Sequence, residues 1–207
     1  MAVDLGTGDG RQVLALAARQ PDTLAIGLDA NAAAMAGSSR RAWRGRGALP
    51  NALFAVAAAE RPPAALDSLA GSLTVNFPWG SLLRGLQGEN DGVLAGVARL
   101  MAPGAEGRIL ISVVPRDGMP PVPPLSELAP AYERHGLDLV EMRPATREEV
   151  AASGSSWAKR LRAGRERPVT LLRFRACHKA PASFVSEVWT HAPNPPPQPT
   201  SPSRQAG

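Results

Sequence analysis

The sequence has little of what several protein classes require. Its 207 residues include one cysteine, Cys177, and three histidines, which rules out an internal disulfide and leaves no metal-binding spacing. No apolar run reaches the length of a membrane span, and no charged and then apolar leader follows Met1. We therefore expect a cytoplasmic, monomeric protein that binds no metal and enters no membrane.

Aromatic residues are also scarce, at 4% of the chain, yet four of them are tryptophans. Arginine, alanine, glycine and proline are abundant instead, and the formal net charge is +5. Such a charge favours an anionic partner, although an arginine-rich genome would produce the same excess.

Apolar periodicity alternates between strand and helix along most of the chain, which predicts an α/β domain with a seven-stranded, mostly parallel sheet. The expected strands are Ala2–Leu5, Leu24–Asp29, Leu53–Ala57, Leu73–Phe77, Arg108–Val114, Leu137–Met142 and Val169–Arg175. The expected helices are Arg11–Arg19, Asn31–Ala42, Ala64–Leu69, Val93–Met101 and Ser126–His135, with a helical insertion at Arg147–Ala163 before the last strand. Pro115–Pro124 is expected to be a linker. The domain would span 1–177, and a proline-rich, disordered tail would span 178–207.

A glycine-rich turn follows the first expected strand and carries Asp4, Gly6, Thr7 and Gly8. Glycines at such a turn let backbone N–H groups approach a cofactor. Asp29 ends the second strand, where a carboxylate can bind both hydroxyls of a ribose. The acidic residues of the turn would repel a pyrophosphate, so the pattern favours S-adenosyl-L-methionine over a dinucleotide. A glycine turn without a ligand is the alternative.

Two further segments follow expected strands. Ala59 and Glu60 could flank an adenine ring, although a plain loop glutamate is equally compatible with the sequence. The segment Asn76–Gly80 places the indole of Trp79 beyond the fourth strand, where ligands of open α/β sheets bind, and an indole can stack on a base. Trp157, in the arginine-rich insertion, could do the same. A buried core aromatic is the alternative for both tryptophans.

Basic residues form two clusters, both expected in loops or insertions. The first contains Arg40, Arg41, Arg44 and Arg46, and the second contains Lys159, Arg160, Arg162, Arg165 and Arg167. Such groups can contact phosphates and hold a protein on RNA without reading its sequence. A solvated charged face is the alternative.

Several motifs together resemble those of the Kam/Npm-type aminoglycoside-resistance methyltransferases. They are the runs Asp4–Gly10, Leu49–Asn51, Ala59–Arg61, Pro78–Gly85 and Ser155–Leu161, and the resemblance spans roughly Ala2 to Phe174. It implies a Rossmann-like class I S-adenosylmethionine-dependent methyltransferase that modifies N1 of adenine 1408 in the 16S rRNA of the 30S subunit. The family also carries a segment before the first strand, so we expect this chain to be truncated at its N-terminus.

The resemblance also implies roles for individual residues. Trp79 and Trp157 would sandwich the flipped adenine, and Ser155 and Glu60 would line its pocket. The cofactor would lie among Asp4, Asp29, Ala59 and Glu60. No general base is expected, because adenine N1 has a free lone pair and the enzyme needs only to position it.

Two other functions remain open at this point. Asn76 begins an Asn-x-Pro-aromatic pattern of the kind in which exocyclic-amine methyltransferases bind the reacting amino group, so an amino-directed or small-molecule methyltransferase is one alternative. An inactive, truncated RNA-binding remnant is the other. It would account for the arginines and for the short N-terminus.

Overall fold

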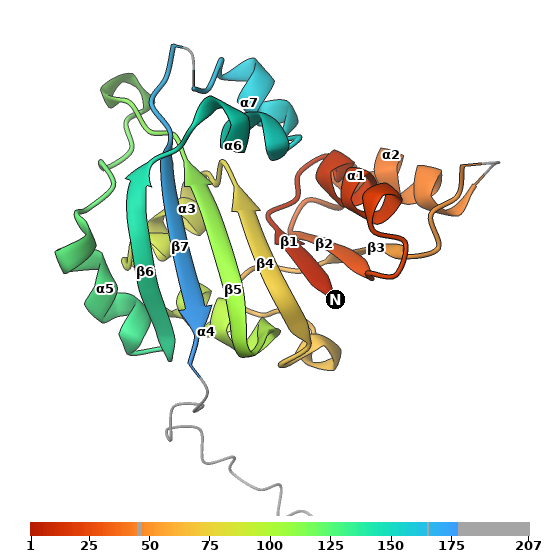
Figure 1. Ribbon diagram of the computed structural model, residues 1–207, viewed down its shortest axis with the longest axis horizontal. Coiled ribbons are helices and arrows are strands. Elements are labelled where there is room, and N and C mark those ends of the chain that lie inside the picture. The colour runs from red at the N-terminus through yellow and green to blue at the C-terminus, as the bar shows by residue number, and fades with distance from the viewer. Residues whose placement is uncertain (45–46, 165, 178–207) are drawn as a thin grey trace, which may run out of the picture.

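The computed structural model describes residues 1–44, 47–164 and 166–177 (Figure 1). The tail predicted at 178–207 lies outside these residues. One seven-stranded sheet runs through the domain in the order β3-β2-β1-β4-β5-β7-β6. Its strands are β1 (Ala2–Leu5), β2 (Ala25–Asp29), β3 (Ala52–Val56), β4 (Ala70–Asn76), β5 (Met101–Ile111), β6 (Leu137–Pro144) and β7 (Thr170–Ala176). Among these strands, only β7 runs antiparallel to its neighbours, which confirms the predicted mostly parallel sheet.

Helices cover both faces of the sheet (Figure 1). They are α1 (Arg11–Arg19), α2 (Ala32–Trp43), α3 (Gly80–Leu86), α4 (Asp91–Leu100), α5 (Leu125–Glu133), α6 (Arg147–Ala152) and α7 (Ser156–Arg160), with 3-10 turns η1 (Ala64–Leu66) and η2 (Pro115–Asp117). Helices α1 and α2 pack on β1–β3, where Val13, Leu14 and Ala17 form a small core with strand alanines. Helices α3–α5 lie on the opposite face and enclose the main core.

Three helical features differ from the sequence-based prediction. The short helix expected at Ala64–Leu69 is only the 3-10 turn Ala64–Leu66. Helix α3 is absent from that prediction, because its seven residues include two glycines and are too short to show a clear apolar period. The insertion before β7 is two short helices rather than one. Gly154 separates them with a φ of 61°, a left-handed conformation that ends a helix.

The strand order places the candidate site. Strands β1 and β4 are neighbours, and the chain winds outward from them in both directions, to β2 and β3 on one side and to β5 on the other. The crevice outside the carboxyl ends of strands at such a switch point is where open α/β sheets bind ligands. The α6–α7 insertion lies beside the same edge of the sheet (Figure 1).

Candidate functional site

A cavity of about 560 Å³ lies at the carboxyl ends of the parallel strands. Its wall contains predicted site residues from the loops after β1, β3 and β4, from the last residue of β2 and from the insertion: Gly6, Gly8, Asp29, Ala59, Glu60, Trp79 and Trp157. The structure therefore brings the glycine turn at the start of the chain together with the insertion near its end. A cavity of this size can hold a nucleoside-sized ligand.

The glycine loop after β1 has the geometry of a cofactor cradle. Gly6 and Gly8 have φ angles of 69° and 58°, which L side chains rarely adopt. A Cβ on Gly6 would also lie 2.5 Å from Leu82 Cδ2, so the packing of α3 against the loop leaves no room for a side chain there. The positive φ angles fit a loop whose backbone approaches a ligand closely.

Asp29 fixes this loop from the end of β2. One carboxylate oxygen accepts a hydrogen bond from the Gly8 N–H, and the other accepts from the Asn31 N–H, each at 2.8 Å. A carboxylate has about four acceptor sites, so it can still bind hydroxyls in the cavity that it lines. The residue thus fits the predicted contact to a ribose.

We expect Asp29→Ala to weaken S-adenosylmethionine binding by about 1.5–3 kcal/mol, because hydrogen bonds to a charged group have this worth. Loss of the bond to Gly8 should add to the effect by loosening the glycine loop. Titration calorimetry measures the change. Asp22→Ala, an exposed carboxylate on the turn before β2, is a matched control, and equal affinity of the Asp29 variant would remove this residue from the site.

Asp4 lies deeper than the sequence suggested. Its carboxylate accepts hydrogen bonds from Thr7 Oγ1 at 2.7 Å, Thr74 Oγ1 at 2.9 Å and Asn76 Nδ2 at 3.1 Å. Burial raises the pKa of Asp4, while these three hydrogen bonds oppose the shift. Asp4 and Thr7 line a narrow second cavity with Ser155 rather than the large one.

The loop after β3 forms another wall of the large cavity. Ala59 is buried and Glu60 is partly exposed, and both line the cavity as predicted. The Ala59 carbonyl packs directly against Gly96 of α4, where a Cβ would overlap it. The absence of a side chain at Gly96 therefore lets this loop lie close to α4.

Both predicted base-stacking tryptophans line the large cavity with much of their surface exposed, 54% for Trp79 and 47% for Trp157. This exposure excludes the alternative that they are core residues. Trp79 precedes α3. It follows Phe77, whose φ of 54° is unusual for an aromatic residue and turns the chain sharply after β4.

Ser155 holds the start of the helix that carries Trp157. Its Oγ accepts a hydrogen bond from the Trp157 N–H at 3.2 Å, which makes Ser155 the N-cap of α7. The guanidinium of Arg160 lies 5.4 Å from the Trp157 ring centroid, within the range of a cation–π interaction. Ser155 and the indole also share the narrow cavity with the glycine loop.

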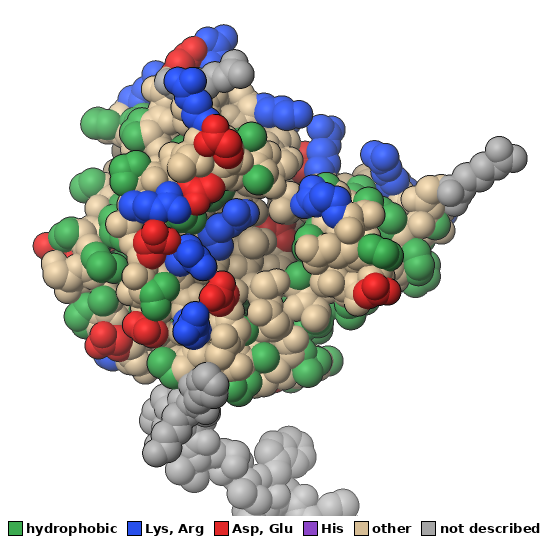
Figure 2. All heavy atoms as spheres, viewed as in Figure 1, with side chains coloured by type: hydrophobic (Ala, Val, Ile, Leu, Met, Phe, Trp, Pro, Cys, Tyr) green, Lys and Arg blue, Asp and Glu red, His purple; other side chains and the backbone are tan. Residues whose placement is uncertain are grey.

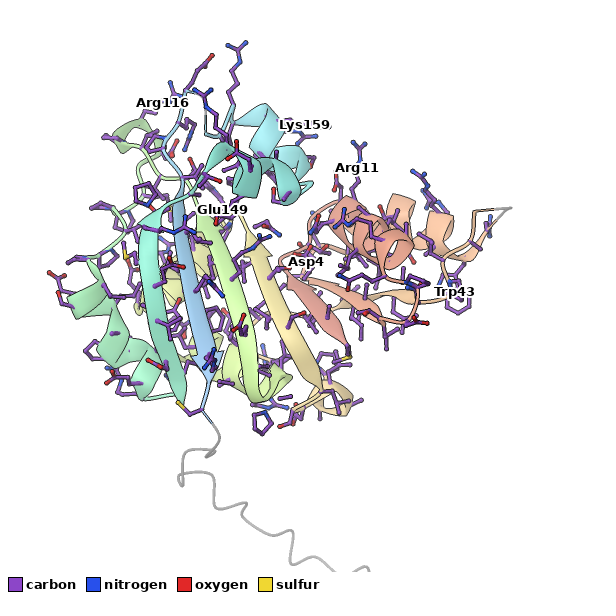
Figure 3. All side chains as sticks on the ribbon, in the orientation of Figure 1. Asp4, Arg11, Trp43, Arg116, Glu149 and Lys159 are labelled. Carbon is purple, nitrogen blue, oxygen red and sulfur yellow. The ribbon has the colours of Figure 1, made fainter. Side chains whose placement is uncertain are left out.

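The basic clusters are only partly as predicted. Arg40, Arg41 and Arg44 are exposed on and just after α2, and Lys159 and Arg160 are exposed on α7, while Arg46 and Arg165 lie outside the described residues. Figure 2 shows blue side chains over the insertion and, across a hollow, above α1 and α2. In Figure 3, Lys159 and Arg11 mark these two groups. Arg162 forms an ion pair with Glu166 at 2.6 Å.

The prediction that Arg167 is a surface phosphate contact is wrong for this structure. Its side chain is 5% exposed and pairs with Asp117 of η2. The guanidinium also donates to Ser112 Oγ at 3.3 Å and to the Ser112 carbonyl at 3.1 Å. Burial with these partners makes Arg167 a link between the insertion and the loop after β5, because a buried arginine needs such compensation.

Sequence reasoning missed several residues that line the large cavity, including Ala30, Ala57, Phe77, Ser112 and Leu161. Four of them lie just beyond the carboxyl ends of β2, β3, β4 and β5. The strand-end rule alone could have found these four. Leu161 had no such signal, because it depends on how the insertion folds back.

Two kinds of site are not found in the part of the chain that the structure describes. Within residues 1–44, 47–164 and 166–177, no three histidine, cysteine, aspartate or glutamate side chains are grouped as metal ligands. None of the helices in these ranges combines the length and apolar character needed to cross a membrane.

Comparison with known proteins gives a consistent result. The model of a protein family described as "NpmA: 16S rRNA (adenine(1408)-N(1))-methyltransferase" matches residues 1–176. A 16S rRNA (adenine(1408)-N(1))-methyltransferase of Streptoalloteichus tenebrarius is 37% identical over 179 residues, which cover 81% of this chain and 82% of that protein. One from Escherichia coli is 31% identical and covers 80% of this chain and 82% of its own length.

Solved structures agree. A mutant 16S rRNA (adenine(1408)-N(1))-methyltransferase from Catenulisporales acidiphilia, crystallised with SAM as cosubstrate, has a TM-score of 0.77 at 31% identity and covers 85% of both chains. The 16S rRNA methyltransferase KamB has a TM-score of 0.75 at 36% identity, covering 85% of this chain and 87% of its own.

Proposed function

The chain belongs to the family of 16S rRNA (adenine(1408)-N(1))-methyltransferases, and from this membership we propose that it methylates N1 of adenine 1408 in the 30S subunit, which would give aminoglycoside resistance. One observation in the structure supports this most directly: two exposed tryptophans line the same cavity as the glycine loop. A methyl donor and a flat base can therefore be held in one space.

The residues that would hold S-adenosylmethionine are those of the three strand-end loops. The cofactor supplies a methyl group on a positively charged sulfur, and that sulfur keeps the electron pair of the C–S bond when adenine N1 forms the new bond. Asp29 would bind the ribose, Gly6 and Gly8 would let the backbone approach, and Ala59 with Glu60 would border the adenine of the cofactor. The backbone of the glycine loop, the free acceptor sites of Asp29 and the cavity volume are all compatible with bound S-adenosylmethionine.

Positioning is the main contribution of the protein to the reaction. The target base must leave its helix before its N1 can reach the cavity, and it then loses its stacking neighbours. Indole rings on two sides can replace them at about 1–3 kcal/mol per stacked base. Trp79 and Trp157 would supply these rings, and Ser155 would hold Trp157 through the α7 cap. Adenine N1 needs no deprotonation, so no general base is assigned.

Docking on the ribosome would use the exposed basic residues on both sides of the cavity. Arg40, Arg41 and Arg44 would contact phosphates from α2, and Lys159 and Arg160 would do so from α7. Phosphate contacts position a protein without reading sequence, so the shape of the folded rRNA would select the target. We further propose that the protein acts as a monomer in the cytoplasm, where 30S subunits are found.

Primer extension on 30S subunits incubated with the protein and S-adenosylmethionine tests the function. Methylation at N1 blocks base pairing and should stop reverse transcriptase at adenine 1408. Mass spectrometry of the nucleosides should show N1-methyladenosine. N6-methyladenosine alone would support an amino-directed enzyme instead, and cofactor binding without any methylation would support an inactive remnant.

Charge reversal on α7 should weaken docking. We expect Arg160→Glu to lower the affinity for the 30S subunit. The steepness of the plot of log affinity against log salt concentration should also fall by about one, because each lost phosphate contact releases roughly one counterion fewer. Filter binding at several salt concentrations measures both. Arg134→Glu makes the same charge change at the C-cap of α5, a helix that lies away from the insertion (Figure 1), and should leave the slope unchanged. Equal slopes for both variants would contradict the proposal that Arg160 contacts a phosphate of the rRNA.

A further inference from the structure

Asn76 is the last residue of β4, and one of its two polar atoms has no partner. Its side chain is among the buried polar groups, at 8% exposed. Nδ2 donates to Asp4 Oδ1 at 3.1 Å, while Oδ1 is fully buried without a hydrogen-bond partner among the described residues. A buried acceptor without a donor is uncommon in folded proteins and calls for a physical reason.

Asp4 sets the orientation of this amide. The same Asp4 carboxylate also accepts hydrogen bonds from the hydroxyls of Thr7 and Thr74. It therefore acts as an acceptor in each of its side-chain hydrogen bonds in the structure. An amide facing such a group presents its NH₂ and turns its oxygen away. Asn76 Oδ1 is therefore held with its free lone pairs directed away from Asp4.

The residue belongs to the walls of both cavities in which a ligand would bind. Asn76 lines both the large cavity with Trp79 and Trp157 and the narrow cavity with Ser155. The next residue, Phe77, has a left-handed backbone that turns the chain away from the strand, so Asn76 remains at the inner wall while Trp79 stands at the rim. A base stacked on the indoles would bring its edge toward this wall.

We propose that Asn76 Oδ1 accepts a hydrogen bond from the N6 amino group of the target adenine, and that this bond both selects adenine and orients its N1 for methylation. The inference rests on the proposed function. The N6 amino group is the donor next to N1, whereas N1 itself must keep its lone pair free. Guanine carries a carbonyl oxygen at the corresponding place and a hydrogen on N1. Its carbonyl oxygen would face Asn76 Oδ1, and two acceptors cannot form a hydrogen bond with each other.

The same bond should strengthen during the reaction. Methylation at N1 turns neutral adenine into a cation whose positive charge is shared with the N6 amino group. A hydrogen bond from a charged donor is stronger than one from a neutral donor. An interaction that is stronger in the transition state than in the ground state lowers the barrier, so Asn76 should affect kcat more than KM.

A double-mutant cycle between enzyme and substrate tests the proposal. Single-turnover methylation is measured for the wild type and Asn76→Ala, each on 30S subunits reconstituted with adenine or with purine, which lacks the amino group, at position 1408. On adenine, Asn76→Ala should be about 10- to 100-fold slower, as expected for one charge-assisted hydrogen bond. On purine, the two enzymes should differ by less than about threefold.

Two controls distinguish contact with the amino group from a disturbed Asp4 network and from a contact with the cofactor. Thr74→Val removes a different donor to Asp4 without altering the cavity wall, so it should keep the wild-type ratio of adenine to purine rates. Calorimetry should show the same S-adenosylmethionine affinity for Asn76→Ala and the wild type. If cofactor affinity falls instead, the free oxygen serves the cofactor and the proposal is overturned.

The remaining outcomes also decide the question. An equal loss of rate by Asn76→Ala on adenine and purine would show that the residue does not act on the amino group. If Asn76→Ala does not fold, the wild type alone still gives a result: an adenine-to-purine ratio near one overturns the proposal. Absence of any methylation of adenine subunits by the wild type would instead contradict the proposed function.

Discussion

Replacing Trp157 with alanine should slow methyl transfer by about 100-fold while 30S affinity stays close to that of the wild type, because stacking on a flipped base is worth about 1–3 kcal/mol and is gained only after flipping. The indole is 47% exposed and lines the large cavity, so its removal leaves no hole in the core. Single-turnover kinetics and filter binding measure the two quantities separately.

Trp43→Ala is a matched control for this experiment. Trp43 ends α2 and is 68% exposed, but it does not line the cavity (Figure 3). Its loss should leave the rate of a bound complex unchanged. If Trp157→Ala lost affinity as severely as Arg160→Glu, Trp157 would be a docking residue and the two-tryptophan sandwich would be wrong.

Gly96→Ala should be the most disruptive small substitution in the cofactor region. The new Cβ would overlap the Ala59 carbonyl, a backbone atom that no side-chain rotation can move away. We expect the free energy of unfolding to fall by about 1–3 kcal/mol, as for other overpacked sites. Since Ala59 and Glu60 line the cavity, S-adenosylmethionine affinity should fall as well.

Gly37→Ala provides the opposite result in a comparable helix. Nothing lies within 4 Å of a Cβ at Gly37 on α2, so alanine there should raise the free energy of unfolding by about 0.5–1 kcal/mol. Urea unfolding and calorimetry of both variants give the comparison. Unchanged stability and cofactor affinity in Gly96→Ala would show that the Ala59 loop can move without cost.

Sequence patterns were reliable where one local signal decided the structure. The bounds of β1 and α1 match the prediction, because a glycine turn separates a short apolar strand from a helix with clear periodicity. The residues after successive strands were also predicted to meet at one edge, and Gly6, Asp29, Ala59 and Trp79 do line one cavity.

Features that depend on contacts across the fold could not be predicted in the same way. Arg167 has the same local surroundings as the arginines before it, and only the folded chain brings Ser112 and Asp117 against it. The free oxygen of Asn76 likewise depends on the register of β1 beside β4, which places Asp4 opposite Thr74, two residues before Asn76. Local pattern carries no information about such pairs.

The segment that carries Trp157 leaves the sheet and returns to it at adjacent points. Pro144 of β6 pairs with Thr170 of β7, and the Ala145 N–H donates to the Val169 carbonyl at 2.8 Å. With its ends held together, this segment can lengthen at little entropic cost, about 0.6 kcal/mol for each doubling of a flexible loop. The architecture thus allows the insertion, which we propose docks on the ribosome, to vary in length during evolution while the sheet and its strand-end loops keep their positions.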